Sequence, residues 1–160
     1  MKFFENRSFD DLCSLKVEEN ARFYCELENY DQLNEIDSFL REKSIKHLVL
    51  GEGTNIVPID NFEGLVIKNK LKGITEIDEC FVKVSSGENW NEFVKWSLSE
   101  ETKGLENLAL IPGTVGAGPV QNIGAYGSEI SKFIEEISVF NFETCLLYTS
   151  PSPRDQRGSR

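Results

Sequence analysis

The chain has 160 residues, of which 39% are hydrophobic and 28% charged, and its 17 basic and 27 acidic residues give a net charge of −10. This composition is typical of one globular domain and excludes a disordered or fibrous chain. The acidic balance excludes a general nucleic-acid binder, because such a protein needs a basic face to displace counterions from phosphates. The sequence contains no long apolar run and no signal-peptide pattern, so we expect a cytoplasmic protein with no membrane partner.

The first half of the chain predicts a strand, a helix and then further strands. Residues 21–27 alternate as a strand does, and residues 29–43 carry apolar side chains at helical spacing. Asn29 or Asp31 can cap the start of that helix. Short apolar segments predict four more strands, at 45–50, 65–69, 74–78 and 81–86.

The second half predicts a helix over 87–100, a glycine-rich loop and a strand over 134–142. Asn89, followed three residues later by Glu92, is a capping-box arrangement at the helix start. The order of these elements lacks the regular strand–helix alternation of a doubly wound sheet. The expected fold class is therefore α+β with mixed strands.

A first glycine loop follows the strand at 45–50 and reads "GEGTN", residues 51–55. Gly51 and Gly53 fit the start of the dinucleotide fingerprint, but its last glycine is replaced by Ile56, where a helix does not start. Two interpretations remain open. The segment is either a plain turn between strands or a nest of backbone N–H groups around an anion, with Thr54 and Asn55 as further donors.

A second glycine loop, residues 104–127, reads "GLENLALIPGTVGAGPVQNIGAYG", with Glu106 and Tyr126 as its only ionisable side chains. Its glycines let backbone approach a flat ring or a diphosphate closely. A flexible linker is the alternative, but the apolar "LENLALIP" favours burial. The pattern predicts a rigid ligand cradle, with Gln121 and Asn122 as amide donors.

The cysteines and the histidine offer little chemistry. The four cysteines form no C-x-x-C pair, so we expect neither a metal site nor structural disulfides. The lone histidine, His47, lies within a predicted strand and is a poor candidate for a catalytic triad.

The last 16 residues, "CLLYTSPSPRDQRGSR", differ in composition from the preceding chain. A natural disordered terminus is one interpretation. The other is an artefact, because Cys145–Asp155 resembles the in-frame translation of a transposase sequencing adapter. We therefore expect a natural domain over 1–144, an N-terminal fragment of a longer protein, and no regular packing of 145–160 on it.

The segments "LGEGTNIV", "GENW" and the second glycine loop, in this order and spacing, resemble the UDP-N-acetylenolpyruvoylglucosamine reductases, also called UDP-N-acetylmuramate dehydrogenases. The resemblance covers essentially residues 1–144 and is similar to the longer-looped class of that family. It implies a truncated α+β FAD-binding fold of the p-cresol methylhydroxylase and vanillyl-alcohol oxidase type, with the flavin between two subdomains.

The resemblance also implies a function. In this family NADPH reduces FAD, and the flavin then reduces UDP-N-acetylglucosamine enolpyruvate to UDP-N-acetylmuramate, a step of peptidoglycan precursor synthesis. The first loop would hold the FAD diphosphate and the second the ring and ribityl side. The cofactor-binding residues implied are Gly51, Glu52, Gly53, Thr54, Asn55, Ile111, Pro112, Gly113, Thr114, Val115, Gly116, Asn122, Gly124, Ala125 and Tyr126.

The catalytic arginine, serine and glutamate of the family would lie beyond the strand at 134–142 and have no counterpart here, and Arg154 and Arg157 are not replacements for them. We therefore expect the chain itself to be inactive. Another FAD-linked oxidase of the same fold, or a non-enzymatic flavin-binding module, remains an alternative. If the main interpretation is right, the two glycine loops should share one cleft, with the leucines of "LENLALIP" buried beneath.

Overall fold

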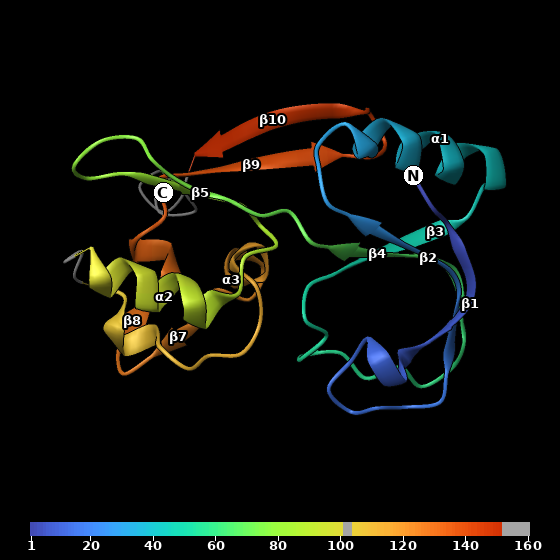
Figure 1. Ribbon diagram of the computed structural model, residues 1–160, viewed down its shortest axis with the longest axis horizontal. Coiled ribbons are helices and arrows are strands. Elements are labelled where there is room, and N and C mark those ends of the chain that lie inside the picture. The colour runs from blue at the N-terminus through green and yellow to red at the C-terminus, as the bar shows by residue number, and fades with distance from the viewer. Residues whose placement is uncertain (101–103, 152–160) are drawn as a thin grey trace, which may run out of the picture.

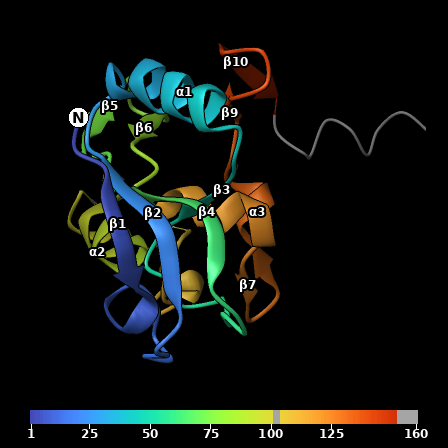
Figure 2. The same ribbon diagram turned by 90° about the vertical axis from the view of Figure 1, so that its right-hand side faces the viewer.

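Four strands of the N-terminal half form a mixed sheet in the computed structural model, which describes residues 1–100 and 104–151 (Figure 1). The order is β1-β2-β4-β3; β2, β4 and β3 run parallel and β1 is antiparallel to β2. Figure 2 shows β1, β2 and β4 side by side. The strand bounds are β1 Phe4–Ser8, β2 Asn20–Leu27, β3 Lys46–Leu50 and β4 Phe62–Asn69.

One face of this sheet is covered by α1 (Gln32–Lys43), which connects β2 to β3. Leu33, Ile36 and Leu40 of the helix are buried against β2 and β4. Of the two predicted caps, Asp31 is the N-cap residue but makes no side-chain cap bond, whereas Asn29 Oδ1 accepts from the Gln32 N–H at 3.3 Å. The opposite face packs on the short 3₁₀ helix η1 (Phe9–Asp11).

A second lobe is built around α2 (Trp90–Ser99), with the hairpin β5 (Ile74–Glu76) and β6 (Val82–Val84) beside it (Figure 1). Its core includes Trp90, whose Nε1 donates to the Leu108 carbonyl at 2.7 Å. The remaining elements are η2 Glu106–Leu108, η3 Val115–Ala117, α3 Gly118–Gln121, β7 Gly124–Ala125, β8 Ser128–Glu129 and η4 Ile130–Lys132.

A long hairpin of β9 (Glu136–Asn141) and β10 (Leu146–Pro151) runs from the second lobe to α1 (Figure 1). Phe140 and Phe142 pack on the core of the first lobe, and Arg41 Nη2 donates to the Phe142 carbonyl at 3.3 Å. The hairpin therefore connects the two lobes at a second place.

The expectation that residues 145–160 lack regular packing is wrong for β10. The strand pairs with β9 along its whole length, because backbone pairing needs an open strand edge and no particular side chains. The large apolar side chains at its start are not in a shared core: Leu146, Leu147 and Tyr148 are 62%, 59% and 48% exposed. Arg154 and Arg157 lie outside the described residues.

The helices and strands predicted from the sequence are present, with ends that differ by about three residues or fewer, and the mixed α+β class is confirmed. β1 has no counterpart in the prediction because it is an edge strand whose residues are mostly exposed and show no apolar alternation. Among the described helices, none is long and apolar enough to cross a membrane.

Candidate cofactor-binding site

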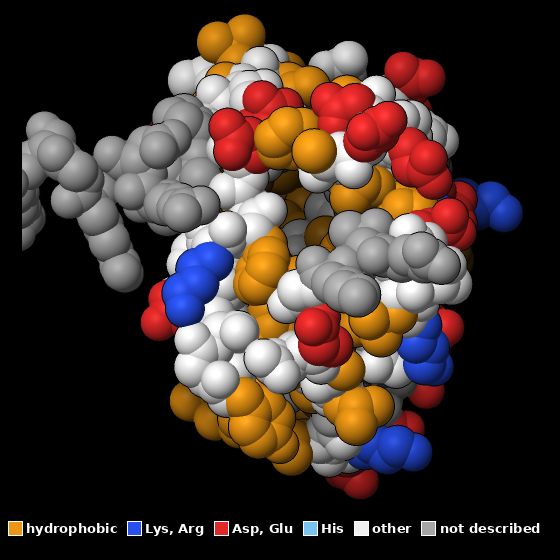
Figure 3. Space-filling view, turned by 90° about the vertical axis from the view of Figure 1, so that its left-hand side faces the viewer, with side chains coloured by type: hydrophobic (Ala, Val, Ile, Leu, Met, Phe, Trp, Pro, Cys, Tyr) orange, Lys and Arg blue, Asp and Glu red, His pale blue; other side chains and the backbone are white. Residues whose placement is uncertain are grey.

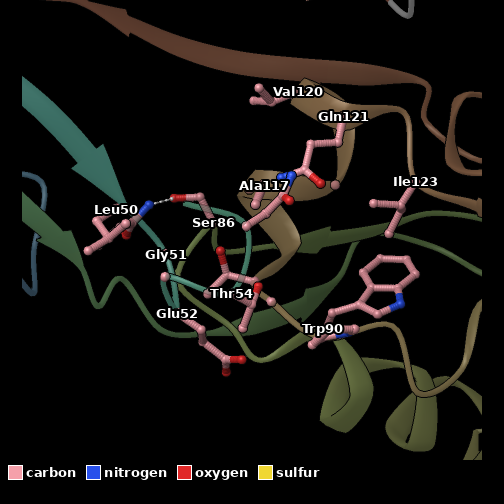
Figure 4. Close-up of a pocket in the computed structure, with 18 of the residues that line it drawn as sticks. Leu50, Gly51, Glu52, Thr54, Ser86, Trp90, Ala117, Val120, Gln121 and Ile123 are labelled. Carbon is pink, nitrogen blue, oxygen red and sulfur yellow. Dashed lines mark hydrogen bonds between the residues drawn. The ribbon is translucent and has the colours of Figure 1, made fainter. Parts of the chain in front are cut away.

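A cavity of about 320 Å³ lies where the two lobes meet, at the carboxyl ends of β3 and β4 (Figure 4). Both glycine loops line it, together with Asn69, Ser86 and Trp90. Ligands of open α/β sheets bind at this end of parallel strands, and small-molecule sites have volumes of about 300 Å³ or more.

The first glycine loop is packed tightly against the N-terminal segment. Gly53 has a φ of +73°, and a β-carbon there would overlap the carbonyl oxygen of Leu12. The Gly53 carbonyl in turn accepts from the Ser14 N–H at 3.1 Å. This position therefore requires glycine both for its backbone conformation and for its close approach to Leu12.

The backbone N–H groups of this loop are unpaired. Within the part of the chain that the structure describes, those of Glu52, Gly53, Thr54 and Asn55 donate to no protein group, although Gly53 is buried. Buried N–H groups are nearly always bonded, and consecutive unpaired N–H groups in a turn are the donor set of an anion-binding nest. The structure therefore favours the nest over the plain turn.

The side-chain charges around the cavity give an anion little help. Of the described residues that line it, none is lysine or arginine, and Glu52 is acidic. The outer face of the second lobe, which points away from the first lobe, also carries a band of acidic side chains and only scattered basic ones (Figure 3). Among the lining residues, the attraction for an anion comes from backbone dipoles and not from basic side chains.

The second glycine loop, in contrast, is bonded to the segment before α2 through some of its backbone N–H groups, although those of Gly113 and Thr114 make no protein hydrogen bond in the described chain. The Val115 N–H donates to the Glu88 carbonyl and the Gly116 N–H to the Ser86 carbonyl, both at 2.9 Å. A β-carbon on Gly116 would lie 2.5 Å from Ser86 Cβ. These contacts are those of a packed, rigid loop and exclude a flexible linker here.

The two loops lie side by side, as predicted. A β-carbon on Gly51 would lie 2.6 Å from Thr114 Oγ1, although more than 60 residues separate them in the sequence. Asn69 Nδ2 also donates to Ser86 Oγ at 2.7 Å across the cavity wall, the dashed line beside Ser86 in Figure 4. One long ligand can therefore contact both loops.

The predicted binding residues divide into two groups. Those that line the cavity are Gly51, Glu52, Gly53, Thr54, Asn55, Pro112, Gly113, Thr114 and Gly116. Ile111 and Val115 pack instead in the core of the second lobe. Asn122 Nδ2 donates to Glu129 Oε2 at 2.9 Å, and Tyr126, at the turn between β7 and β8, is 92% exposed. Gly124 and Ala125 form β7 and, like Tyr126, are not among the cavity residues.

The leucines of "LENLALIP" are buried only in part. Leu108 is fully buried and Leu105 packs partly against the same core. Leu110 is 81% exposed, which contradicts the prediction for this residue. Its φ of +62° turns the chain at this point, and its side chain faces away from the core.

Several cavity residues had no counterpart in the binding set implied by the sequence. They are Val49, Leu50, Ile56, Asn69, Ser86, Trp90, Ala117, Gly118, Val120, Gln121 and Ile123. Gln121 was expected only as an amide donor of the cradle. Asn69 is the last residue of the strand predicted over 65–69, which pairs in parallel with β3 in the structure. The rule that ligands bind at the carboxyl ends of parallel strands could therefore have identified it.

Comparison with known proteins shows what this architecture is similar to. Residues 21–143 match the FAD binding domain family. A UDP-N-acetylenolpyruvoylglucosamine reductase of Paraburkholderia phymatum is 50% identical over 114 residues, which are 69% of this chain and 33% of that protein. The reductase of Photobacterium profundum is 37% identical over 90% of this chain and 42% of its own length. The chain thus spans about two fifths or less of the curated relatives it matches.

Solved structures support the same fold. A UDP-N-acetylenolpyruvylglucosamine reductase from Thermus caldophilus superposes with a TM-score of 0.75 at 23% identity, over 97% of this chain and 54% of that one. A cholesterol oxidase superposes with a TM-score of 0.54 at 12% identity, over 93% of this chain and 32% of that one. The resemblance stated from the sequence, and the FAD-binding fold it implied, are confirmed.

Proposed function

The chain belongs to the FAD-binding domain family, and we propose that it is the flavin-binding part of a UDP-N-acetylenolpyruvoylglucosamine reductase. The observation that carries this proposal is the cluster of unpaired N–H groups at residues 52–55 beside the rigid second loop. The donor set fits a diphosphate, and the bare backbone of the second loop fits a flat ring.

Within the cavity, the N–H groups of residues 52–55 would bind the diphosphate, and Thr54 would add its hydroxyl group. Gly113, Thr114 and Gly116 would contact the ring side of the cofactor. When bound, FAD supplies the hydride chemistry, and the protein's contribution is to hold and orient it. The second loop is suited to this task because its own hydrogen bonds fix it before the cofactor arrives.

The activity of the whole protein is part of the proposal. It would be the NADPH-dependent reduction of UDP-N-acetylglucosamine enolpyruvate to UDP-N-acetylmuramate, in the cytoplasm, for peptidoglycan synthesis. Because the chain spans 42% and 33% of the length of these two relatives, we propose that it binds FAD without completing the reaction alone.

The test is a titration of the purified chain with FAD, riboflavin and ADP, followed by flavin fluorescence and calorimetry. If the diphosphate is bound by the first loop, FAD should bind about tenfold or more tightly than riboflavin, and ADP should compete with it. Equal affinity for FAD and riboflavin would contradict the placement of the diphosphate. No binding of any flavin would contradict the cofactor proposal for this chain. Binding of FAD without NADPH oxidation by the full-length gene product would favour a non-enzymatic flavin-binding module.

A further inference from the structure

Asn89 connects the first glycine loop to the start of α2. Its Oδ1 accepts from the Glu92 N–H at 2.9 Å and so caps the helix. Its Nδ2 donates to the Glu52 carboxylate, in the first glycine loop of the other lobe. One side chain therefore serves two elements that lie on opposite sides of the cavity.

The Glu52 carboxylate needs such a partner, because an acidic group in an anion-binding loop repels the ligand. In Figure 4 the Glu52 side chain extends away from Ala117 and Gln121. It is directed toward Asn89 at the N-terminus of α2, where the helix dipole favours a negative charge. The half-buried Lys68 is a further counter-charge: burial lowers the pKa of its ammonium group, and the Glu52 carboxylate opposes that shift.

The first loop has few other anchors. In the described chain its N–H groups at residues 52–55 make no protein hydrogen bonds, so they do not fix its shape. The backbone bond from Ser14 to the Gly53 carbonyl holds one side of it, and Glu52 holds the side that faces the second lobe.

We infer that Glu52 and Asn89 form a latch that fixes the first glycine loop before the cofactor binds and keeps the acidic group away from the diphosphate. The inference rests on the proposed function for its ligand, but the latch itself is a feature of the ligand-free chain. Both are positioning residues. Without the latch, the ordering of the loop would be a cost of binding, and affinity would fall.

The test exchanges the two functional groups. Asn89→Asp keeps a good helix cap but sets two carboxylates against each other. Glu52→Gln keeps an acceptor for Asn89. In the double variant Glu52→Gln/Asn89→Asp the amide is at residue 52 and the carboxylate at residue 89, so the same hydrogen bond can form with donor and acceptor exchanged. The readouts are the heteronuclear ¹⁵N NOE of residues 51–55 without ligand and the Kd for FAD, with circular dichroism as the check of folding.

We expect Asn89→Asp to lower the NOE values of the loop and to weaken FAD binding about tenfold, with about a twofold change for Glu52→Gln. The double variant should return both readouts to within about twofold of the unmodified chain. An unchanged loop in Asn89→Asp, or a double variant as impaired as that single one, would overturn the latch. If the unmodified chain binds no FAD, the proposed function fails, while the NOE series still decides whether the latch exists.

Discussion

The two glycine loops meet at one cavity but differ in where their backbone hydrogen bonds go. In the described chain, the N–H groups of residues 52–55 have no protein acceptor. In the second loop the N–H groups of Val115 and Gly116 are bonded to the segment that precedes α2, whereas those of the buried Gly113 and Thr114 also donate to no protein group in the described chain. A run of four consecutive free donors is suited to bind an anion, whereas a loop that is bonded on one side is suited to present a fixed surface with two further donors.

Their glycines also have different purposes. Gly53 has a positive φ and lies against the backbone of Leu12, whereas Gly116 is required only for its close approach to Ser86. A glycine-rich pattern alone therefore does not distinguish a ligand-contacting glycine from a packing glycine. The variants below test this difference, in order of expected effect.

Gly53→Val should have the largest effect, because a β-branched residue at positive φ is strained and its β-carbon would overlap the Leu12 carbonyl. We expect the free energy of unfolding to fall by about 3 kcal/mol or more, measured by urea denaturation. The clash is with the protein's own backbone, so a loss of flavin binding would follow from displacement of the loop and not from contact with a ligand. The matched control is Gly127→Val, at a similar φ of +79° with no atom within 4 Å of the added β-carbon. An equal loss in the control would assign the effect to backbone strain alone.

Gly116→Ala should be less severe, because only close packing against Ser86 is disturbed. A loss of about 1–3 kcal/mol in unfolding free energy is expected, with a weaker Kd for FAD as the second loop moves. Gly118→Ala is the control, since its β-carbon would meet the flexible end of Ile123 at 3.3 Å. Equal stability of Gly116→Ala and the unmodified chain would show that the loop is not fixed at this contact.

Ser86→Ala removes the acceptor of the Asn69 Nδ2 bond between the lobes. The expected cost is about 1 kcal/mol, by urea denaturation, because the Asn69 amide loses a partner in a partly buried place. Ser38→Ala, which removes a bond on the exposed face of α1, should be neutral or slightly stabilising. The contact between the lobes is unimportant if the two variants have the same stability.

Salt should have the smallest effect. Because the lining residues that the structure describes include no lysine or arginine, the Kd for FAD should change by about twofold or less between about 50 mM and about 500 mM sodium chloride. Isothermal titration at several salt concentrations measures it. A steep loss of affinity would mean that basic side chains, and not the backbone dipoles of the first loop, bind the diphosphate.

The sequence was most informative where local pattern decides the outcome. Apolar periodicity located α1 and α2, and the cap at Asn89 is found where the capping-box pattern placed it. Only half of that box forms, because the Glu92 carboxylate pairs with Lys95 at 2.7 Å. The edge strand β1 and the pairing of β10 were not predicted from the sequence, because an open edge accepts a strand with almost any side chains.

The sequence by itself determined the family, the α+β class and the two glycine loops as the parts that form the site. Only the tertiary structure decided which side chains reach the cavity. Ile111 and Val115 lie in the second loop yet turn into the core, whereas Asn69 and Ser86, outside both loops, line the cavity. The physical reason is that the local sequence shows where the backbone needs a positive φ or an absent β-carbon. The direction of a side chain depends instead on the segments, distant in the sequence, that pack against it.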